Sequence, residues 1–204
     1  AELADARKGI HLLRDAHPRA RDMVASFGER LCAPIAAAWL DRRHPAAAVD
    51  ARDWIVTDDT FTSAAVLSGP TKRAAAAGYR KLRAARGKSV IAVVTGFVAR
   101  TEDGRTTTIG RNGSDYTAAL VGAALGAKVI EIWTDIDGIL SADPAAVPGA
   151  FVIPQLSYEE AMELSYFGAR VLHSATIAPA VSKKIPIRIK NTLNPLAPGT
   201  LISA

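Results

Sequence analysis

The sequence predicts an α/β fold in which a mostly parallel sheet is layered between helices. The apolar run at residues 89–97 is nearly continuous, as expected of a strand buried on both faces, and residues 128–133 and 185–190 are predicted to be a second buried strand and a third strand. Segments with a helical pattern alternate with these runs. The order strand, helix, strand, helix, strand is typical of a sheet covered by helices.

The amino-terminal segment, residues 3–40, is predicted to be mainly helical, with a break at His17-Pro18 because proline disfavours a helical conformation in the residue before it. Residues 22–40 carry apolar side chains at close to helical spacing: Met23, Phe27, Leu31, Ile35 and Trp39. Residues 45–50 are predicted to be a linker-like turn. Residues 51–56 are predicted to be a short segment that enters a strand.

Composition restricts the class of protein. A length of 204 residues suits one or two domains with a substantial core. No apolar run approaches the roughly eighteen residues of a membrane span, and residues 1–15 do not resemble a signal peptide. The only cysteine, Cys32, excludes an internal disulfide and fits a reducing compartment, and we expect it to pack on a helix. A cytoplasmic protein without a membrane partner is expected.

Basic residues are densest between positions 72 and 88, where they are interleaved with alanines. A nucleic-acid surface would also need stacking aromatic residues, and Tyr79 is the only one nearby. We therefore expect a solvated helix face that leads into the strand at Ser89, and no nucleic-acid partner.

The most informative segment is Gly110-Arg111-Asn112-Gly113-Ser114-Asp115, which follows a hairpin turn at residues 102–105 and precedes an alanine-rich helix at 116–126. The glycines allow close backbone approach, and the helix start offers unpaired N–H groups. Arg111 supplies a planar donor fork for a carboxylate or phosphate. The segment is either a site for a small anion or a tight strand-to-helix turn with a surface arginine.

A second polar segment, Thr134-Asp135-Ile136-Asp137-Gly138, follows the apolar run at 128–133. Ligands of open α/β sheets bind beyond the carboxyl ends of strands, so this segment can hold a nucleotide. Alternatively, its Asp and Gly residues serve turn geometry alone. Farther along, Ser157-Tyr158-Glu159-Glu160 is a capping box that opens a helix.

Together, these segments resemble the aspartate kinase branch of the amino-acid kinase family. The resemblance covers about residues 22–204 and lies in the segments 26–29 (Ser-Phe-Gly-Glu), 110–115, 133–138 with 142–144, 156–173 and 191–202. Within this branch, the sequence is most similar to bifunctional enzymes that join aspartate kinase to homoserine dehydrogenase. The resemblance implies a three-layer sandwich with a central mostly parallel sheet, truncated at the amino terminus. Residues 1–104 would form part of the aspartate-binding lobe, and residues 105–204 the nucleotide-binding lobe.

Site residues follow from the resemblance. Glu29 would pair with the substrate ammonium and Arg111 would hold a carboxylate. Asp115 and Arg111 would be catalytic, with Asp115 ordering the catalytic lysine or the metal. The implied substrate-binding residues are Glu29, Phe97, Arg111, Gly113, Ser114 and Asp115. The implied nucleotide-binding residues are Thr134, Asp135, Leu140, Arg170 and Val171. No protein ligand to a metal is assigned.

The reaction implied by the resemblance transfers the γ-phosphoryl group of ATP to the β-carboxylate of L-aspartate, the first step of lysine, threonine and methionine biosynthesis. Mg²⁺ would accompany the nucleotide. Such chemistry depends on positioning and charge neutralisation, so no base is needed, and His173 is expected to pack or to cap a helix. Expected partners are L-aspartate, ATP, a second copy in a homodimer, and regulatory or second-enzyme domains of a longer polypeptide.

Departures from the family pattern leave alternatives open. The Lys-Phe-Gly-Gly loop of the family does not occur in these 204 residues. Leu140 and Ala145 stand where relatives usually carry tyrosine and arginine, and losing that arginine would remove a charge-assisted phosphate contact. Arg170 replaces a common lysine. A non-catalytic binding or assembly module is therefore the second hypothesis, and a sibling kinase for another carboxylate or phosphate is the third.

Overall fold

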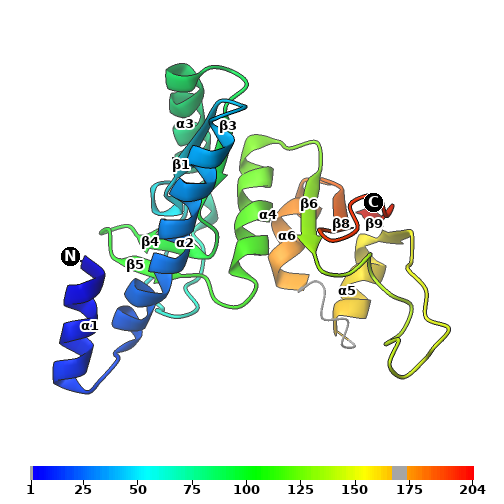
Figure 1. The fold of residues 1–204 in the computed structure, drawn as a ribbon, viewed down its shortest axis with the longest axis horizontal. Helices are drawn as coiled ribbons and strands as arrows, with labels where there is room; N and C mark the ends of the chain where they lie inside the picture. Colours follow the sequence, from blue (N-terminus) through cyan, green and yellow to red (C-terminus); the bar gives the residue numbers. More distant parts are fainter. Residues whose placement is uncertain (1, 167–173) are drawn as a thin grey trace. The chain divides into compact units, whose positions relative to one another are not determined.

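The computed structural model describes residues 2–166 and 174–204, and the chain divides into two compact units, Ala1–Thr117 and Ala118–Ala204 (Figure 1). The lobe boundary predicted after residue 104 falls inside a hairpin. There, β4 (Val98–Thr101) and β5 (Thr106–Thr108) pair antiparallel, with Val98 opposite Thr108. The first unit therefore continues through this hairpin to Thr117.

Two helices begin the first unit, α1 (Glu2–Leu13) and α2 (Pro18–Leu40). The predicted break at His17 is confirmed, since its ψ of 143° is not helical. The His17 ring accepts a hydrogen bond from the Arg19 amide at 3.4 Å, and Pro18 occupies the first turn, where its missing N–H is not needed.

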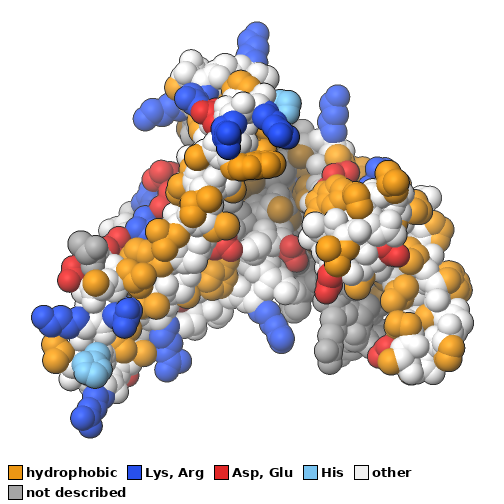
Figure 2. Space-filling view, in the orientation of Figure 1, with side chains coloured by type: hydrophobic (Ala, Val, Ile, Leu, Met, Phe, Trp, Pro, Cys, Tyr) orange, Lys and Arg blue, Asp and Glu red, His pale blue; other side chains and the backbone are white. Residues whose placement is uncertain are grey.

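Helix α2 packs on β1 (Ala46–Val49), β3 (Ile91–Val94) and β5. Its buried stripe consists of small and polar residues: Asp22, Ser26, Ala33 and Ala37. Small side chains allow a helix to lie close to a sheet. The larger apolar residues Leu31, Ile35 and Trp39 of α2 are exposed. Figure 2 shows hydrophobic side chains along the surface of this helix. Cys32 is exposed too, so the packing role predicted for it is wrong.

The strands of the first unit correct two predictions. Residues 45–50 are not a linker-like turn, because β1 pairs parallel with β3 even though its Ala-Ala-Ala-Val sequence has weak strand propensity. The run at 89–97 is not buried on both faces. Its strand β3 has β1 as its one partner among the described strands, and Ile91 is exposed. As predicted, residues 51–56 are a short segment that enters a strand. They form the 3-10 turn η1 (Ala51–Asp53) and lead into β2 (Val56–Thr57), which the structure pairs parallel with β4.

Helix α3 (Ser68–Arg86) carries the basic segment. Its buried residues are Thr71 and Ala75, which confirms the predicted solvated face, and Figure 2 shows Lys and Arg side chains gathered around this end of the unit. Arg86 is held by Asp41 at 2.7 Å and by the Ala46 carbonyl at 3.0 Å. Within the described residues, no helix combines the length and hydropathy of a membrane span.

The second unit contains a mixed sheet in the order β6-β8-β9-β7. Its strands are β6 (Ile130–Thr134), β7 (Gln155–Ser157), β8 (Ile187–Asn191) and β9 (Thr200–Ser203). Its helices are most of α4 (Gly113–Leu125), α5 (Tyr158–Tyr166) and α6 (Ser174–Ser182). Isoleucine side chains dominate the core, including Ile130, Ile177, Ile187, Ile189 and Ile202.

The predicted α/β class is confirmed. Pairs β1-β3, β2-β4, β6-β8 and β7-β9 are parallel, and pairs β4-β5 and β8-β9 are antiparallel. The described strands form sheets of two, three and four strands rather than one continuous sheet. The predicted capping box is also present. The Ser157 amide donates to Glu160 Oε2 at 2.7 Å, and the Glu160 amide donates to Ser157 Oγ at 3.1 Å.

Candidate functional site

The loop after β5 packs against the turn after β3 without room for side chains at two glycines. A Cβ placed on Gly113 would lie 2.8 Å from Cδ2 of the Phe97 ring and 3.0 Å from the Phe97 Cα. A Cβ on Gly96 would lie 2.6 Å from Ser114 Oγ. The structure thus brings together three of the residues predicted to bind substrate: Phe97, Gly113 and Ser114.

Phe97 has a φ of 65°, in the left-handed region that bulky residues rarely adopt. Its backbone is held from two sides. The Ile109 amide donates to the Phe97 carbonyl at 3.0 Å, and the Phe97 amide donates to Thr117 Oγ1 at 3.1 Å. Thr117 in turn donates to the Gly113 carbonyl at 2.8 Å. Strained backbone persists where its surroundings fix it in this way.

Arg111 lies just before the first turn of α4 and is exposed. The described residues provide no ion-pair partner for it. Its guanidinium is therefore available to an anion, next to helix N–H groups that also favour negative charge. Asn112, with a φ of 55°, accepts a hydrogen bond on its carbonyl from the Tyr116 amide at 3.0 Å and so starts the helix.

Asp115 lies in the first turn of α4 and is half-buried. The start of a helix favours a charged carboxylate. Burial nevertheless raises the pKa of Asp115 above its ordinary value of 3.8, because the charged form loses hydration. An acid in such an environment is typical of functional sites, and it would keep its proton to a higher pH than an exposed aspartate.

Glu29 lies on the same stripe of α2 as Asp22, Ser26 and Ala33, and it is half-buried. It lies about 10 Å from Asp22 along the helix axis, at 1.5 Å per residue. The stripe faces β1, β3 and β5, so Glu29 is on the sheet side of the helix.

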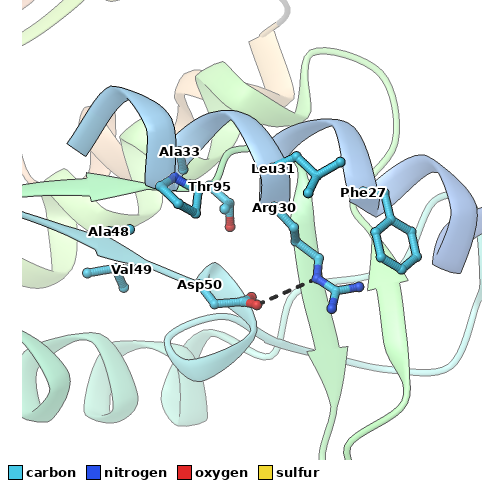
Figure 3. A pocket seen from close by; sticks show the side chains of 9 residues that line it. Phe27, Arg30, Leu31, Ala33, Ala48, Val49, Asp50 and Thr95 are labelled. Carbon is cyan, nitrogen blue, oxygen red and sulfur yellow. Dashed lines mark ion pairs between the residues drawn. The ribbon is translucent and has the colours of Figure 1, made fainter. Parts of the chain in front are cut away.

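The neighbouring residue Arg30 contacts this stripe, since its guanidinium donates to Ser26 Oγ at 3.4 Å. It lines a cavity of about 350 Å³ together with Phe27, Asp50 and Thr95 (Figure 3). Its guanidinium lies 4.5 Å from the centre of the Phe27 ring and 3.8 Å from Asp50 Oδ2.

The negative charge of Asp50 in this cavity is already balanced by Arg52. Burial works against its charged form, but hydrogen bonds from Arg52 outweigh burial and hold the pKa of Asp50 below 3.8. Both charges of the Arg30–Asp50 pair are thus engaged within the protein. Arg111, by contrast, has no ion-pair partner among residues 2–166 and 174–204.

In the second unit, the polar segment after β6 lies at the carboxyl end of the sheet. Thr134 and Asn191 end the parallel strands β6 and β8 and are register partners. Thr134 donates through Oγ1 to Asp135 Oδ1 at 3.1 Å, and its carbonyl accepts from the Thr192 amide at 2.8 Å. Leu140 is partly buried and forms a bridge with Val152. Arg170, Val171 and His173 lie outside the described residues.

Sequence reasoning missed Asp137, which organises this segment. Its Oδ1 accepts from Asn191 Nδ2 at 2.8 Å and from Asn194 Nδ2 at 3.1 Å, so it joins the loops after β6 and β8. A Cβ on the adjacent Gly138 would lie 2.6 Å from both Thr200 Oγ1 and Val152 Cγ1. The available signal was an Asp-Gly pair directly after a strand.

Asp22 was missed as well. It is 2% exposed and connects α2 to β5. Its signal was a carboxyl side chain at helical spacing from Ser26, Ala33 and Ala37, on a stripe that is otherwise small.

The two loops differ in charge. The loop of the first unit offers the exposed cation Arg111 and helix amides, which suit an anionic group. The segment of the second unit offers the carboxylates of Asp135 and Asp137. Within residues 2–166 and 174–204, no group of three or more His, Cys, Asp or Glu side chains is arranged to hold a metal ion by itself.

Comparisons with known proteins identify the family of this chain. Residues 2–191 match the model of the amino acid kinase family. Aspartokinase 3, chloroplastic, of Arabidopsis thaliana is 40% identical over 199 residues, which cover 96% of this chain and 35% of the relative. The bifunctional aspartokinase/homoserine dehydrogenase of Haemophilus influenzae is 44% identical over 177 residues, covering 86% of this chain and 21% of the relative.

Among solved structures, the crystal structure of E. coli aspartokinase III in complex with aspartate and ADP is similar over 99% of this chain and 46% of that chain. The TM-score is 0.85 and the sequence identity is 35%. The chain thus spans about a third of the plant relative's length and less than half of the E. coli enzyme.

Proposed function

This chain belongs to the amino acid kinase family, in its aspartokinase branch, and from that membership we propose that it transfers the γ-phosphoryl group of ATP to the β-carboxylate of L-aspartate. The observation that carries the proposal is the loop at Gly110–Asp115. The loop contains an exposed arginine without a partner among the described residues and the start of a helix, and its Gly113 packs tightly against Phe97. An amino acid with two carboxylates fits this combination.

In the proposed reaction, a carboxylate oxygen of aspartate attacks the γ-phosphorus. A new P–O bond forms, the bond to the β-phosphate oxygen breaks, and ADP leaves with that electron pair. The carboxylate is already ionised, so no base is required. Positioning and electrostatic stabilisation carry such a transfer.

The roles of the first unit follow from its groups. Arg111 binds a substrate carboxylate through its donor fork, and Glu29 on α2 pairs with the ammonium group. Phe97 and Gly113 shape the pocket. Ser114 and Asp115 lie at the start of α4, where N–H groups favour developing negative charge.

The second unit is proposed to bind the nucleotide. Thr134, Asp135 and Leu140 lie at or beyond the carboxyl end of β6, the edge at which α/β sheets bind ligands. Arg170 and Val171 are proposed to line the same site.

Mg²⁺ fits this scheme as an ion carried by the nucleotide, because it is commonly held by one or two carboxylates together with substrate phosphates. Asp135 and Asp137 are the carboxylates of this segment that could approach it. The ion would neutralise phosphate charge.

The test is titration calorimetry and steady-state kinetics of the full-length protein with L-aspartate and Mg-ATP. Arg111→Ala should lower the specificity constant for aspartate by between about tenfold and a hundredfold, since a hydrogen-bonded charge contact contributes roughly 1.5–3 kcal/mol. Affinity for ATP should not change. Arg80→Ala, which removes an exposed arginine of α3, is the matched control. An unchanged specificity constant in Arg111→Ala would refute the assignment.

A non-catalytic module is the second candidate, favoured by Leu140 and by Ala145, whose amide only closes a turn with Asp143 Oδ1 at 2.9 Å. Binding of both ligands by the full-length protein without formation of ADP would support it. A homodimer, a cytoplasmic location and a role in lysine and threonine biosynthesis remain predictions, and sedimentation analysis would test the dimer.

A further inference from the structure

Asp22 is a buried carboxyl group that makes three hydrogen bonds with uncharged donors. Its Oδ2 accepts from the Thr62 amide at 2.8 Å and from the Thr108 amide at 3.1 Å, and its Oδ1 accepts from Thr108 Oγ1 at 2.7 Å. Within the described part of the chain, no cation pairs with it. Burying a carboxyl group is costly unless its oxygens are hydrogen-bonded, so these bonds account for its place in the structure.

The bonds hold the strand end that leads into the substrate loop. Thr108 is the last residue of β5, and only Ile109 separates it from Gly110-Arg111. Its amide and hydroxyl donate to Asp22, and its carbonyl accepts from the Ala64 amide at 2.9 Å. Asp22 thus supplies two of the contacts that fix where the loop begins.

The same carboxyl group holds the segment beneath the loop. Thr62 has a φ of 74°, a conformation that β-branched residues rarely adopt. A Cβ on Gly110 would lie 3.3 Å from Ser63 Cβ and 3.7 Å from the Thr62 carbonyl oxygen, so this strained segment directly supports Gly110. Without Asp22, the Thr62 amide loses the bond that opposes its strain.

We propose that Asp22 is a positioning residue for the Gly110–Asp115 loop. By holding Thr62 and Thr108 on one side chain of α2, it sets the position from which Arg111 and the first turn of α4 meet the substrate carboxylate. This inference rests on the proposed function for its effect on catalysis, although its effect on the loop can be measured independently.

The variants separate positioning from general stability. Asp22→Ala removes all three bonds. Asp22→Asn retains an oxygen for the two amides and places an NH₂ group beside the Thr108 hydroxyl, which can accept instead of donating. Thr108→Val removes the hydroxyl bond alone and is the milder variant should Asp22→Ala fold poorly.

The matched control is Thr71→Val. Thr71 is also 2% exposed and also joins a helix to a strand, since its Oγ1 accepts from the Val56 amide at 3.0 Å and donates to the Val56 carbonyl at 3.1 Å. It contacts neither Thr62 nor Thr108 through these bonds. Its loss should lower stability without affecting the loop.

Kinetics of the full-length protein provide the first measurement. Asp22→Ala should raise the KM for aspartate by between about tenfold and a hundredfold, the range in which small misplacements of binding groups act. The KM for ATP should stay within about twofold, because Asp22 contacts only the first unit. Thr108→Val should raise the KM for aspartate less than Asp22→Ala does. In Asp22→Asn, the KM for aspartate should be close to the wild-type value, and Thr71→Val should leave it unchanged.

Amide hydrogen exchange provides the second measurement, which does not depend on activity. Asp22→Ala and, to a lesser degree, Thr108→Val should speed exchange at Thr62 and across residues 108–115, whereas Thr71→Val should not. If the wild-type protein neither binds nor phosphorylates aspartate, the proposed function fails, and the exchange pattern alone decides the positioning role. Equal exchange in Asp22→Ala and Thr71→Val would overturn the inference, as would an equal KM for aspartate in these two variants.

Discussion

The loop after β5 and the loop after β6 each begin where a strand ends and each contain a glycine packed against its neighbours, yet they are held differently. In the first unit, a carboxyl group from a helix far away in sequence, Asp22, hydrogen-bonds to the strand end, and the loop presents the exposed Arg111. In the second unit, the loop's own Asp137 binds amide groups of a neighbouring loop. A loop supported from outside keeps its own charged group for a ligand, whereas a loop that supports itself uses part of its charge on structure.

The largest effect expected from breaking this arrangement concerns the two packed glycines. Gly113→Ala should force Phe97 to move, and Gly138→Ala should force Thr200 and Val152 to move. Each should lower the free energy of unfolding by roughly 1–3 kcal/mol, as overpacking does. Urea unfolding measures this loss. Calorimetry should show that Gly113→Ala weakens aspartate binding alone and Gly138→Ala weakens ATP binding alone.

An equal loss of affinity for aspartate and for ATP in either glycine variant would contradict the assignment of one ligand to each loop.

Removal of the self-supporting contact should have an intermediate effect. Asp137→Ala leaves the side-chain amides of Asn191 and Asn194 without this acceptor, at a cost of about 1–2 kcal/mol. The KM for ATP should rise while the KM for aspartate stays constant. Asp143→Ala is the control, because the Asp143 side chain accepts one hydrogen bond, from the Ala145 amide, in an exposed turn. Similar values of the KM for ATP in both variants would show that Asp137 does not shape the nucleotide loop.

A smaller effect, of opposite sign, is expected where the support of the first loop is strained. Thr62→Gly relieves a β-branched residue at a φ of 74° and should stabilise the protein by about 0.5–1 kcal/mol. Thr60→Gly in the same segment should destabilise it, since Thr60 is not among the residues with positive φ and loses its hydroxyl bond to Asp58. Thermal unfolding measures both changes. A lower melting temperature for Thr62→Gly would mean that the Thr62 conformation carries no strain.

The smallest effects should appear in the pH dependence of stability at the starts of α4 and α5. Burial raises the pKa of Asp115 above 3.8, so the folded state binds the proton more tightly than the unfolded chain. Stability should therefore fall as pH rises from 3.8 through the raised pKa, and Asp115→Asn should stabilise the protein at neutral pH.

Glu160 should behave in the opposite way. Hydrogen bonds within its capping box lower its pKa below 4.5, so stability should fall as pH drops through the lowered pKa. The change should be slight because Glu160 is exposed. Urea midpoints across the acid range measure both slopes. Slopes of the same sign for Asp115 and Glu160 would contradict this difference.

Local signals in the sequence were sufficient for most elements. The His17-Pro18 break, the capping box at Ser157 and the turn at 102–105 depend on neighbouring residues, and all three are present. Strand β1 was missed because its alanines carry little propensity and its pairing with β3 is between segments far apart in the chain. The burial of β3 was misjudged because an apolar run does not show how many strands lie beside it.

In the candidate site, too, residues with a local sequence signal were predicted and residues that act through long-range contacts were not. The loop motif identifies Arg111 and Gly113, whose chemistry is local. The support of that loop by Asp22 depends on a contact between residues 86 positions apart, which no local pattern contains. Asp137 was passed over because an Asp-Gly pair predicts a turn equally well without any partner.

Helix α2 carries both Asp22 and Glu29 on one face, about 10 Å apart along a rod with a rise of 1.5 Å per residue. A slide of this rod along its axis moves both carboxyl groups by the same amount. Asp22, which supports the arginine loop, and Glu29, the proposed counter-ion of the substrate ammonium, would therefore move together with α2. The losses of aspartate-binding free energy caused by substitutions at residues 22 and 29 should not add in a double-mutant cycle. The reason is that one helix would position the groups at both ends of the bound amino acid.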